Sequence, residues 1–542
     1  MKKYLMLLVL IVTCLSVACS AFITIDVNED VNNVFLVGTN PDEVDFTEFF
    51  IINDLLEEDV VVTKSMLNLS RVDFSKKGSF YVTINYKEVY KSVEIIVIEE
   101  GKDESSFDPN TVSKDRLQDA LMEYDGAIGL PSTGTYSCLV VPIQFKDTKI
   151  SSNDLVRLNS AFNGDDTGWE SVSSYYKKSS YGKLNLSFDI ADVYVSSKTS
   201  YYYERYSERV DDGNGDYHYQ YGEEALMLEV LSNLEPRMDL TKYDVNNDGT
   251  IDAIFLIYSA DVEYNDENSI YWAYVSYYLT NENDNKTFDG LDVYYYLFAG
   301  FDFMDENSED SFFDSLSGLK VNASTYIHET GHLLGLDDYY DYYPNEGSDE
   351  GLGCADMMDY SVGDHNCYSK LMMGWIEPIV VTKDQTLTIK NFESSGDFIM
   401  ILLDYDGSYF SEYLLIDLYS ATGLNELHSR LDDSYLFDGE QFGVRIYHVS
   451  SSITNPFSDE YYSVTDNNNS LTKNALIKLI EADGDKNFDG YGQAMGSDLW
   501  KKGMKFSDVY PKYTSYDYKT LWFDIIIEDV NISEAKITID YK

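Results

Sequence analysis

Residues 327–341 read I-H-E-T-G-H-L-L-G-L-D-D-Y-Y-D, with two histidines four residues apart and a glutamate beside the first. On a helix, His328 and His332 lie on one face about one turn apart, so both imidazoles can bind one ion. Zinc is the expected ion, because it binds neutral histidine nitrogens and keeps one position open in catalytic sites. Glu329 is then the candidate general base, since a carboxylate beside a zinc-bound water can take its proton.

The residues after the helix predict a third ligand. Gly335 stands three positions past His332, where a helix that ends in a turn uses the positive φ of glycine. Asp338 stands ten positions past His328, where the metzincin pattern H-E-x-x-H-x-x-G-x-x-H has its third ligand. We therefore expect zinc to be bound by His328, His332 and Asp338. The competing third ligands are Glu346, Asp356 and His365, all of which require the following loop to fold back over the site.

Two residues farther along are candidates for supporting roles. Met358, chosen over the neighbouring Met357, is expected to form a Met-turn, which is an apolar floor beneath the metal. Tyr360 is expected to donate a hydrogen bond to the oxyanion that develops during catalysis. The alternative is that both are ordinary core residues of a turn.

A second candidate metal site is the acidic loop, residues 244–252, which reads D-V-N-N-D-G-T-I-D. Its pattern of oxygen-bearing side chains, with Gly at the sixth place, matches the first nine positions of an EF-hand calcium loop. Phe255 occupies the twelfth position, where a glutamate would complete the shell. Two interpretations stay open: calcium binding with further ligands from elsewhere, or a loop held by its own Asx-turn hydrogen bonds. The calcium ligands would be Asp244, Asn246, Asp248, Thr250 and Asp252.

Residues 1–21 are expected to form an export signal, because two lysines precede an apolar run and small residues follow. Cys19 follows L-S-V-A, which resembles a bacterial lipobox. Lipid attachment to Cys19, and through it to a membrane, and ordinary cleavage near Ala18 or Ala21 are both open. Either way, we expect the mature protein to be extracellular, either secreted or lipid-anchored at the cell surface.

Composition narrows the classes of partner. The chain has 542 residues and a formal net charge of −56, which argues against nucleic acid and anionic membrane as partners. With 44% hydrophobic residues it can bury large cores in two to four domains, and we expect a monomer. Three cysteines follow the signal, too few for a disulfide scaffold. A disulfide between Cys354 and Cys367 and two buried thiols are both open.

The predicted fold class is multidomain α+β, with three domains after the signal. Residues 22–104 are expected to form an immunoglobulin-like β-sandwich, with strands at 22–25, 60–63, 79–84 and 93–98. A propeptide is the competing interpretation of that segment. Residues 105–135 are a linker with a short helix at 114–124, and residues 136–380 form a metzincin-like α/β zinc domain. Residues 381–542 form a β-sandwich in which His428 and His448 are structural.

The chain resembles the immune inhibitor A family of secreted bacterial zinc metallopeptidases. The likeness is densest over residues 136–378, through L-V-V-P-I-Q-F at 139–145, S-V-S-S-Y-Y-K-K-S-S-Y-G-K-L at 171–184 and the H-E-x-x-H-x-x-G-x-x-D core. It continues more weakly through E-Y-L-L-I-D at 412–417 and G-V-R-I-Y-H at 443–448. The resemblance implies zinc held by two histidines and an aspartate, with Glu329 as base. The family's usual propeptide is not recognisable.

These features together predict an exported zinc-dependent endopeptidase that hydrolyses peptide bonds of extracellular proteins. The rival class is a surface adhesion or binding protein with a degenerate peptidase core. The intact Glu329 disfavours this rival. The preferred bond, the natural substrate and the activation route are not encoded in any recognisable motif.

Overall fold

The structure is a computed structural model, and it describes residues 23–98, 117–304, 321–404, 409–451, 469, 475–510 and 523–541. Gaps inside these ranges fall at 29–30, 32, 42–43, 55–56, 58–59, 71, 77, 88, 125–127, 165–166, 212–216, 253, 263–268, 279–286, 341–350, 431–435 and 485–492. The chain divides into two compact units: residues 1–103 with 511–523, and residues 104–510 with 524–541. The predicted signal and Cys19 lie outside the described residues.

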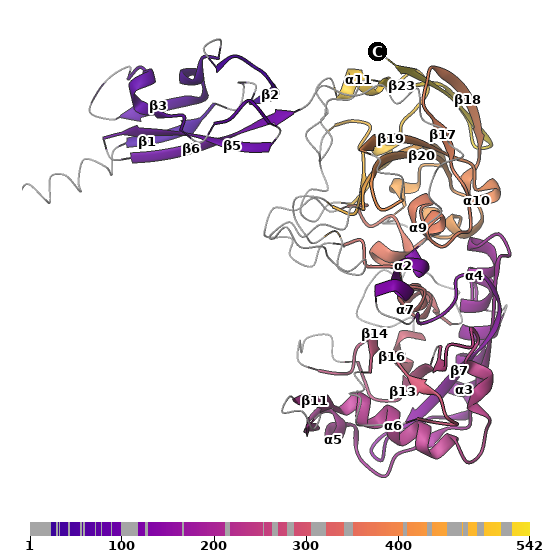
Figure 1. Cartoon of the computed structure of the whole chain (residues 1–542). Coiled ribbons are helices and arrows are strands. Elements are labelled where there is room, and N and C mark those ends of the chain that lie inside the picture. The colour runs from indigo at the N-terminus through magenta and orange to yellow at the C-terminus, as the bar shows by residue number, and fades with distance from the viewer. Residues whose placement is uncertain are drawn as a thin grey trace, which may run out of the picture. The chain divides into compact units, whose positions relative to one another are not determined.

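The first unit is built from two small sheets around one core (Figure 1). One sheet pairs β1 (Ile23–Val27) antiparallel with β3 (Phe50–Asp54). The other has the order β2-β6-β5-β4, with bounds Val34–Leu36, Val89–Ile98, Gly78–Tyr86 and Leu67–Asn68. Alternate residues of β1 are buried, as expected of strands with one face on a core.

One strand prediction in this unit is wrong. Residues 60–63 form no strand and lead directly into a 3-10 helix, η3 (Lys64–Met66). Val60 and Val62 pack against the core while Val61 is 75% exposed, so the run has an inward face but no strand among the described residues to pair with. The core is instead filled by aromatic residues around η2 (Phe46–Phe49), including Phe46, Phe49 and Phe74.

The second unit begins with a six-stranded sheet of order β14-β16-β13-β7-β8, to which β9 adds beside β7. The strands β7, β8, β13 and β16 are parallel, while β14 pairs antiparallel with β16 at the edge. All residues of β13 are buried, which fits a strand covered on both faces. The bounds are Gly134–Gln144 (β7), Leu184–Ile190 (β8), Tyr194–Val195 (β9), Ile254–Tyr258 (β13), Tyr274–Tyr277 (β14) and Tyr295–Gly300 (β16).

Helices cover this sheet on both faces. On one face, α3 (Ser152–Asn163), α4 (Val172–Ser179) and α7 (Ser324–Leu333) share a core with Phe255 and Leu297 of the sheet. On the other face, α6 (Gly222–Leu234) packs on Leu256 and Phe298. The neighbouring shorter elements are α5 (Ser200–Glu204), β10 (Ser207–Asp211), β11 (Tyr217–Tyr221), η5 (Leu240–Tyr243), β12 (Thr250–Ile251), β15 (Asp292–Val293) and η6 (Phe301–Met304).

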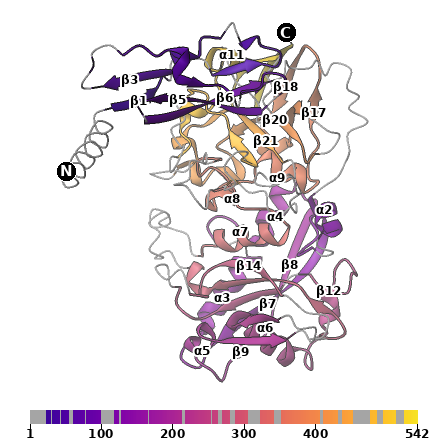
Figure 2. The same ribbon diagram turned by 60° about the vertical axis from the view of Figure 1, so that its left-hand side comes forward.

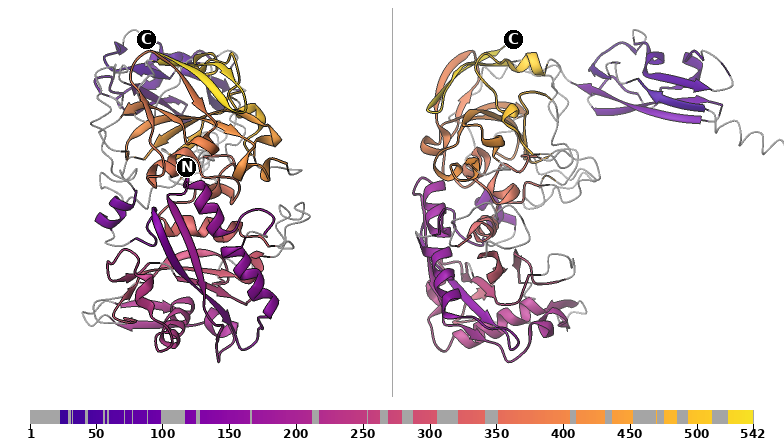
Figure 3. Two further views of the ribbon diagram at one scale, coloured as in Figure 1. Left: turned by 90° about the vertical axis from the view of Figure 1, so that its right-hand side faces the viewer. Right: turned by 180° about the vertical axis from the view of Figure 1, so that it is seen from behind.

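The carboxyl-terminal part consists mainly of strands, as predicted, and Figure 3 shows them as orange and yellow arrows. A five-stranded sheet has the order β17-β19-β20-β21-β22, with bounds Ile379–Val381, Phe398–Asp404, Glu412–Ser420, Phe442–Ser450 and Ile477–Leu479. A three-stranded sheet has the order β18-β24-β23, with bounds Gln385–Lys390, Glu534–Tyr541 and Phe523–Val530. The helices here are short: α9 (Cys367–Met372), α10 (Phe392–Ser395) and α11 (Phe506–Val509).

One hydrophobic core runs from the six-stranded sheet into the carboxyl-terminal strands. Polar contacts join the same two regions: the Tyr181 hydroxyl donates to the carbonyl of Phe392 at 2.6 Å, and the N–H of Asp364 donates to the side-chain oxygen of Asn425 at 2.9 Å. Residues on both sides of the predicted boundary at 380 therefore share one core. None of the helices in the described ranges is long and apolar enough to cross a membrane.

Candidate metal centre

The helix that bears both histidines ends in the turn expected from Gly335. α7 lies against β14 and β16 on one side and against α8 (Met357–Tyr360) on the other (Figure 2). The N–H of Leu336 donates to the carbonyl of Gly331 at 3.0 Å, and that of Gly335 to His332 at 2.9 Å. This is the Schellman arrangement, which needs a residue with positive φ, and Gly335 has φ +98°. The chain thus reverses and returns toward the histidines.

Three donor atoms converge after this reversal. Nε2 of His328 lies 2.9 Å from Oδ1 of Asp338, and Nε2 of His332 lies 3.3 Å from the same oxygen. The candidate ligand atoms of the three residues all lie within 4.8 Å of one another. Asp338 is buried. The turn that brings it to the histidines spans residues 334–338, and we call it the metal turn. These three residues are a group that can hold a metal ion.

Backbone carbonyls determine which histidine nitrogens face this group. Nδ1 of His328 contacts the carbonyl oxygen of Met357 at 2.7 Å, and Nδ1 of His332 contacts that of Leu336 at 2.7 Å. A carbonyl oxygen only accepts, so each Nδ1 carries the proton and each Nε2 presents its lone pair. Two nitrogen lone pairs and a carboxylate oxygen therefore face one another. Such an arrangement needs a cation between the three atoms, and carbonyl-anchored imidazoles are the usual outer shell of zinc sites.

The electrostatics of the three residues agree with this geometry. Although burial opposes the charged imidazolium, the Asp338 carboxylate raises the pKa of His332 to about 10. Burial raises the pKa of Asp338, but His332 and His328 outweigh that effect and hold the pKa well below its usual range. Without a metal ion, His332 thus holds a proton, and its positive charge balances the Asp338 carboxylate. A divalent cation would replace that proton, since metal ligands bind in their deprotonated forms.

Glu329 lies beside the ligands. Its side chain is buried and lines the same cleft as His328, His332 and Asp338. Its Oε2 atom is buried and accepts no hydrogen bond from the described residues. Burial raises the pKa of Glu329, although the two histidines oppose that shift. A carboxylate in this position has a lone pair available for a proton.

Met358 packs against the helix that bears both histidines, and its role as a Met-turn stays a prediction. Gly331 stands between the two histidines, and a Cβ atom added there would lie only 2.4 Å from the Met358 sulfur. The Met358 carbonyl also accepts from the N–H of Tyr339 at 2.8 Å, next to Asp338. The two adjacent methionines therefore contact the site in different ways. Met358 packs against the helix at Gly331, and the Met357 carbonyl orients the His328 ring.

Tyr360 is placed less favourably for its predicted role. It ends α8, its side chain is 41% exposed, and it is not among the described residues that line the cleft around Glu329. Its assignment as an oxyanion donor stays a prediction.

The competing third ligands are engaged elsewhere or lie outside the described residues. The Asp356 carboxylate caps α8 by accepting from the N–H of Met358 at 2.8 Å, and it also accepts from the N–H of Asn366 at 2.8 Å. His365 is buried among the rings of Tyr175, Tyr176 and Trp375. Glu346 is outside the described ranges.

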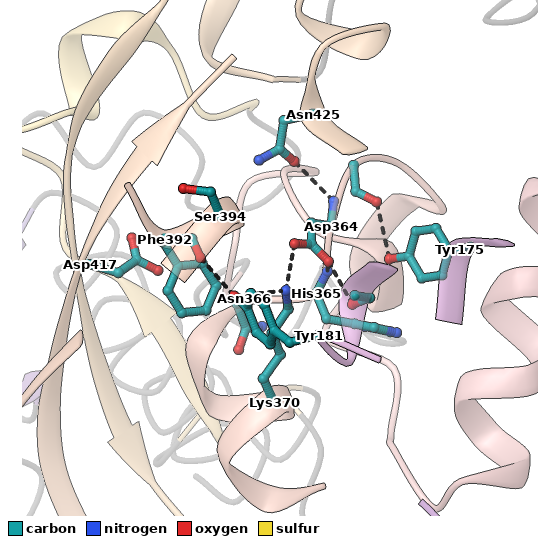
Figure 4. A network of polar contacts seen from close by, with 12 residues as sticks. Tyr175, Tyr181, Asp364, His365, Asn366, Lys370, Phe392, Ser394, Asp417 and Asn425 are labelled. Atoms are coloured by element: carbon teal, nitrogen blue, oxygen red, sulfur yellow. Dashed lines mark hydrogen bonds and ion pairs between the residues drawn. The ribbon is translucent and has the colours of Figure 1, made fainter. Parts of the chain in front are cut away.

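A buried ion pair fixes the segment that holds His365. The ammonium of Lys370 donates to Asp364 at 2.5 Å, and Figure 4 shows these two side chains pointing toward each other, with Tyr181 and Phe392 beside the lysine. The hydroxyl of Ser179 on α4 donates to the same carboxylate at 2.6 Å. The network therefore ties Asp364 to α4 through Ser179 and to α9 through Lys370.

The cleft around the metal centre has an edge strand as one border. Ala273, Tyr274, Val275 and Tyr277, from β14 and the residue before it, line the cleft together with the metal-ligand candidates. Among the described strands, β14 pairs with β16 alone, at the edge of the sheet. Asp337 also lines the cleft, but it does not belong to the converging group.

The acidic loop is shaped by its own hydrogen bonds. The N–H groups of Asp248 and Gly249 donate to the Asp244 carboxylate at 3.1 and 3.2 Å, and the N–H of Thr250 donates to Asp248 at 2.9 Å. The side-chain oxygen of Asn246 also accepts from Asp248, at 3.0 Å. Burial raises the pKa of Asp252 to about 7, and its Oδ1 accepts no hydrogen bond from the described residues. Hydrogen bonds within the loop thus engage the carboxylates of Asp244 and Asp248.

The cysteine and remaining histidine predictions have clear outcomes. Cys367 is a free thiol buried in the core, so the Cys354–Cys367 disulfide does not form. His428 is fully buried and its pKa is lowered to about 3 by that burial. His448 is buried and contacts the Glu412 carboxylate at 2.7 Å. Both histidines are core residues, as predicted.

Comparison with known proteins gives little. No protein-family model matches the chain, and no curated protein matches it. The chain is similar to the crystal structure of metalloproteinase-II from Bacteroides fragilis, with 13% sequence identity, coverage of 48% of this chain and 67% of that chain, and a TM-score of 0.18. So distant a likeness carries no weight for function, and membership of the immune inhibitor A family stays an expectation.

Proposed function

We propose that the protein is an exported zinc endopeptidase. The observation that supports this most is the convergence of two histidine lone pairs and the Asp338 carboxylate beside the buried Glu329, in a cleft bordered by an edge strand. A binding protein with a degenerate core has no need for this combination. Extracellular proteins are the proposed substrates, and the proposed route of export, with or without a lipid on Cys19, depends on residues outside the described ranges.

The proposed mechanism assigns a separate role to each side chain. His328, His332 and Asp338 would hold the zinc ion, which when bound supplies Lewis acidity toward water and the peptide carbonyl. Glu329 takes the proton of the attacking water and passes it to the leaving amine. Its raised pKa suits this double role, because a group that accepts and then releases a proton works best when its pKa is near the working pH.

β14 gives the substrate its proposed orientation. An extended peptide can pair with the outer edge of this strand through backbone hydrogen bonds, while its side chains occupy the cleft. Backbone pairing does not depend on sequence, so selectivity would come from the residues that line the cleft. Trp272, Tyr274, Tyr277 and Tyr295 make that lining strongly aromatic.

The test is hydrolysis of casein by the purified full-length protein with zinc. We expect cleavage in the wild type, loss of cleavage with a zinc chelator, and a decrease of about 10²–10⁴-fold in Glu329→Gln, which removes the base. Zinc content of Glu329→Gln should stay near one ion per chain, which separates loss of the base from loss of the metal. Wild-type protein that holds zinc and cleaves no protein substrate would favour the adhesion protein, and full activity in Glu329→Gln would remove this residue from the mechanism.

A further inference from the structure

α2 (Leu117–Tyr124) lies in the segment that we predicted as a linker, yet it packs against the metal turn. Leu117 and Leu121 are buried, and they belong to the same core as Leu334 and Leu336 of that turn. A Cβ atom added at Gly335 would lie 2.4 Å from Cδ1 of Leu121. Leu121 therefore fills the space directly beside the one residue whose positive φ reverses the chain.

Gln118 ties the same turn to two other segments through its side-chain amide. Its Nε2 donates to the carbonyl of Leu334 at 3.0 Å and to that of Leu130 at 2.7 Å, and its Oε1 accepts from the N–H of Ser132 at 2.8 Å. Leu334 is the C-cap of α7, and side-chain donors commonly satisfy the carbonyls left open at a helix end. Both N–H donors of this amide and one lone pair of its oxygen are thus bonded to backbone groups.

The segment after α2 approaches the helix end equally closely. A Cβ atom at Gly129 would lie 2.6 Å from the carbonyl oxygen of Leu333, so only glycine lets the two backbones meet there. Gly129 and Leu121 also line the cleft next to His332. The end of α7 is consequently held from outside by residues that precede the first strand of the sheet.

We infer that Gln118 and Leu121 are positioning residues for the third metal ligand. Asp338 is only three residues past Gly335, and its oxygen must meet both Nε2 atoms. A shift of the turn therefore moves this ligand directly, together with the Leu336 carbonyl that orients His332. His328 is instead fixed by the helix and by the carbonyl of Met357, which lies outside the turn. Loss of the α2 contacts should weaken metal binding without removing any ligand. This inference rests on the metal site of the proposed function.

The test uses the full-length protein and two readouts of the site other than peptidase activity. One is the zinc dissociation constant from competition with a chelator, and the other is the visible absorption of the cobalt-substituted protein, which reports coordination geometry. Gln118→Glu keeps the acceptor for Ser132 and removes the donor, and Gln118→Met removes both at similar length. Leu121→Ala removes the contact with Gly335, with Leu121→Val as a milder form if the alanine variant does not fold. Asp119→Asn, on the exposed side of α2, is the matched control.

We expect the dissociation constant to rise about 10- to 100-fold in the Gln118 and Leu121 variants, as for other residues that orient ligands, with an altered cobalt spectrum. Asp119→Asn should leave both unchanged. Variants that melt at a lower temperature but bind zinc as tightly as the wild type, with an unchanged cobalt spectrum, would show that α2 only stabilises the fold and would overturn the inference. A wild-type protein that binds no zinc would instead overturn the proposed function.

Discussion

At the end of α7, two histidine N–H groups donate to backbone carbonyls, and the lone pairs that remain face the Asp338 carboxylate. In the acidic loop, the carboxylates of Asp244 and Asp248 instead accept from the backbone N–H groups of the loop itself. Both segments were candidate metal sites on spacing alone. In these two segments, the hydrogen bonds to the backbone decide whether the ligand atoms are left facing one another or are used to shape the chain.

The largest expected effect is the loss of proteolysis on zinc chelation, which calcium chelation should not reproduce. A zinc-selective chelator such as 1,10-phenanthroline should reduce proteolysis at least about 100-fold, because it removes the ion that the mechanism requires. Removal of calcium with EGTA should leave most activity, because the acidic loop is held by its own hydrogen bonds. EGTA also binds zinc, so a zinc buffer must keep free zinc saturating. Loss of activity on calcium removal while zinc stays bound would contradict this distinction between the two segments.

The next largest effect is a difference in unfolding free energy between alanine variants of two glycines that have similar backbone angles. Gly335 has φ +98° and Gly249 of the acidic loop has φ +91°, so alanine at either position should cost about 1–2 kcal/mol of unfolding free energy. An added Cβ meets Leu121 at position 335 and open space at position 249, so Gly335→Ala should cost about 1–3 kcal/mol more. Urea denaturation of both variants measures the difference. Equal losses would show that the turn after α7 is no more tightly packed than the acidic loop.

A pH dependence of the zinc-free protein follows from His332. Its folded pKa of about 10 is above the ordinary histidine value, so its contribution to stability is fully present below about pH 6.5 and is lost as the pH rises toward 10. The melting temperature of the zinc-free protein should therefore fall over that range more than that of the zinc-loaded protein. Asp338→Asn serves as the control, because it removes the charge that raises the histidine pKa. Parallel curves for the zinc-free and zinc-loaded forms would contradict this account of the site.

The smallest expected effect concerns calcium. We propose that the acidic loop binds calcium weakly, with the buried Asp252 carboxylate among its ligands, and that millimolar calcium raises the melting temperature by mass action. Asp248→Ala should remove that rise and leave zinc content unchanged. No response in the wild type, or the same response in the variant, would mean that the loop is an Asx-turn structure alone.

The spacing of residues 328–338 was enough to predict the helix end and the convergence of His328, His332 and Asp338, because both depend on local helix geometry. The role of Glu329 as base stays a prediction. The supporting contacts were not predictable, since they join distant segments. Gln118 and Leu334 are separated by 216 positions, and no pattern around the glutamine indicates its partner. The carbonyls of Met357 and Leu336 were missed for another reason: every residue has a carbonyl, so residue type gives no signal. The strand predicted at 60–63 was wrong because propensity does not provide a pairing partner.

The most direct test of the metal centre is the zinc content and zinc affinity of Asp338→Ala beside Asp337→Ala. Both residues line the cleft, so the pair matches charge, location and sequence context while only Asp338 belongs to the converging group. We predict that Asp338→Ala loses zinc and activity together, whereas Asp337→Ala keeps about one zinc per chain. Zinc retained at wild-type affinity in Asp338→Ala would contradict the account and would mean that another residue completes the site.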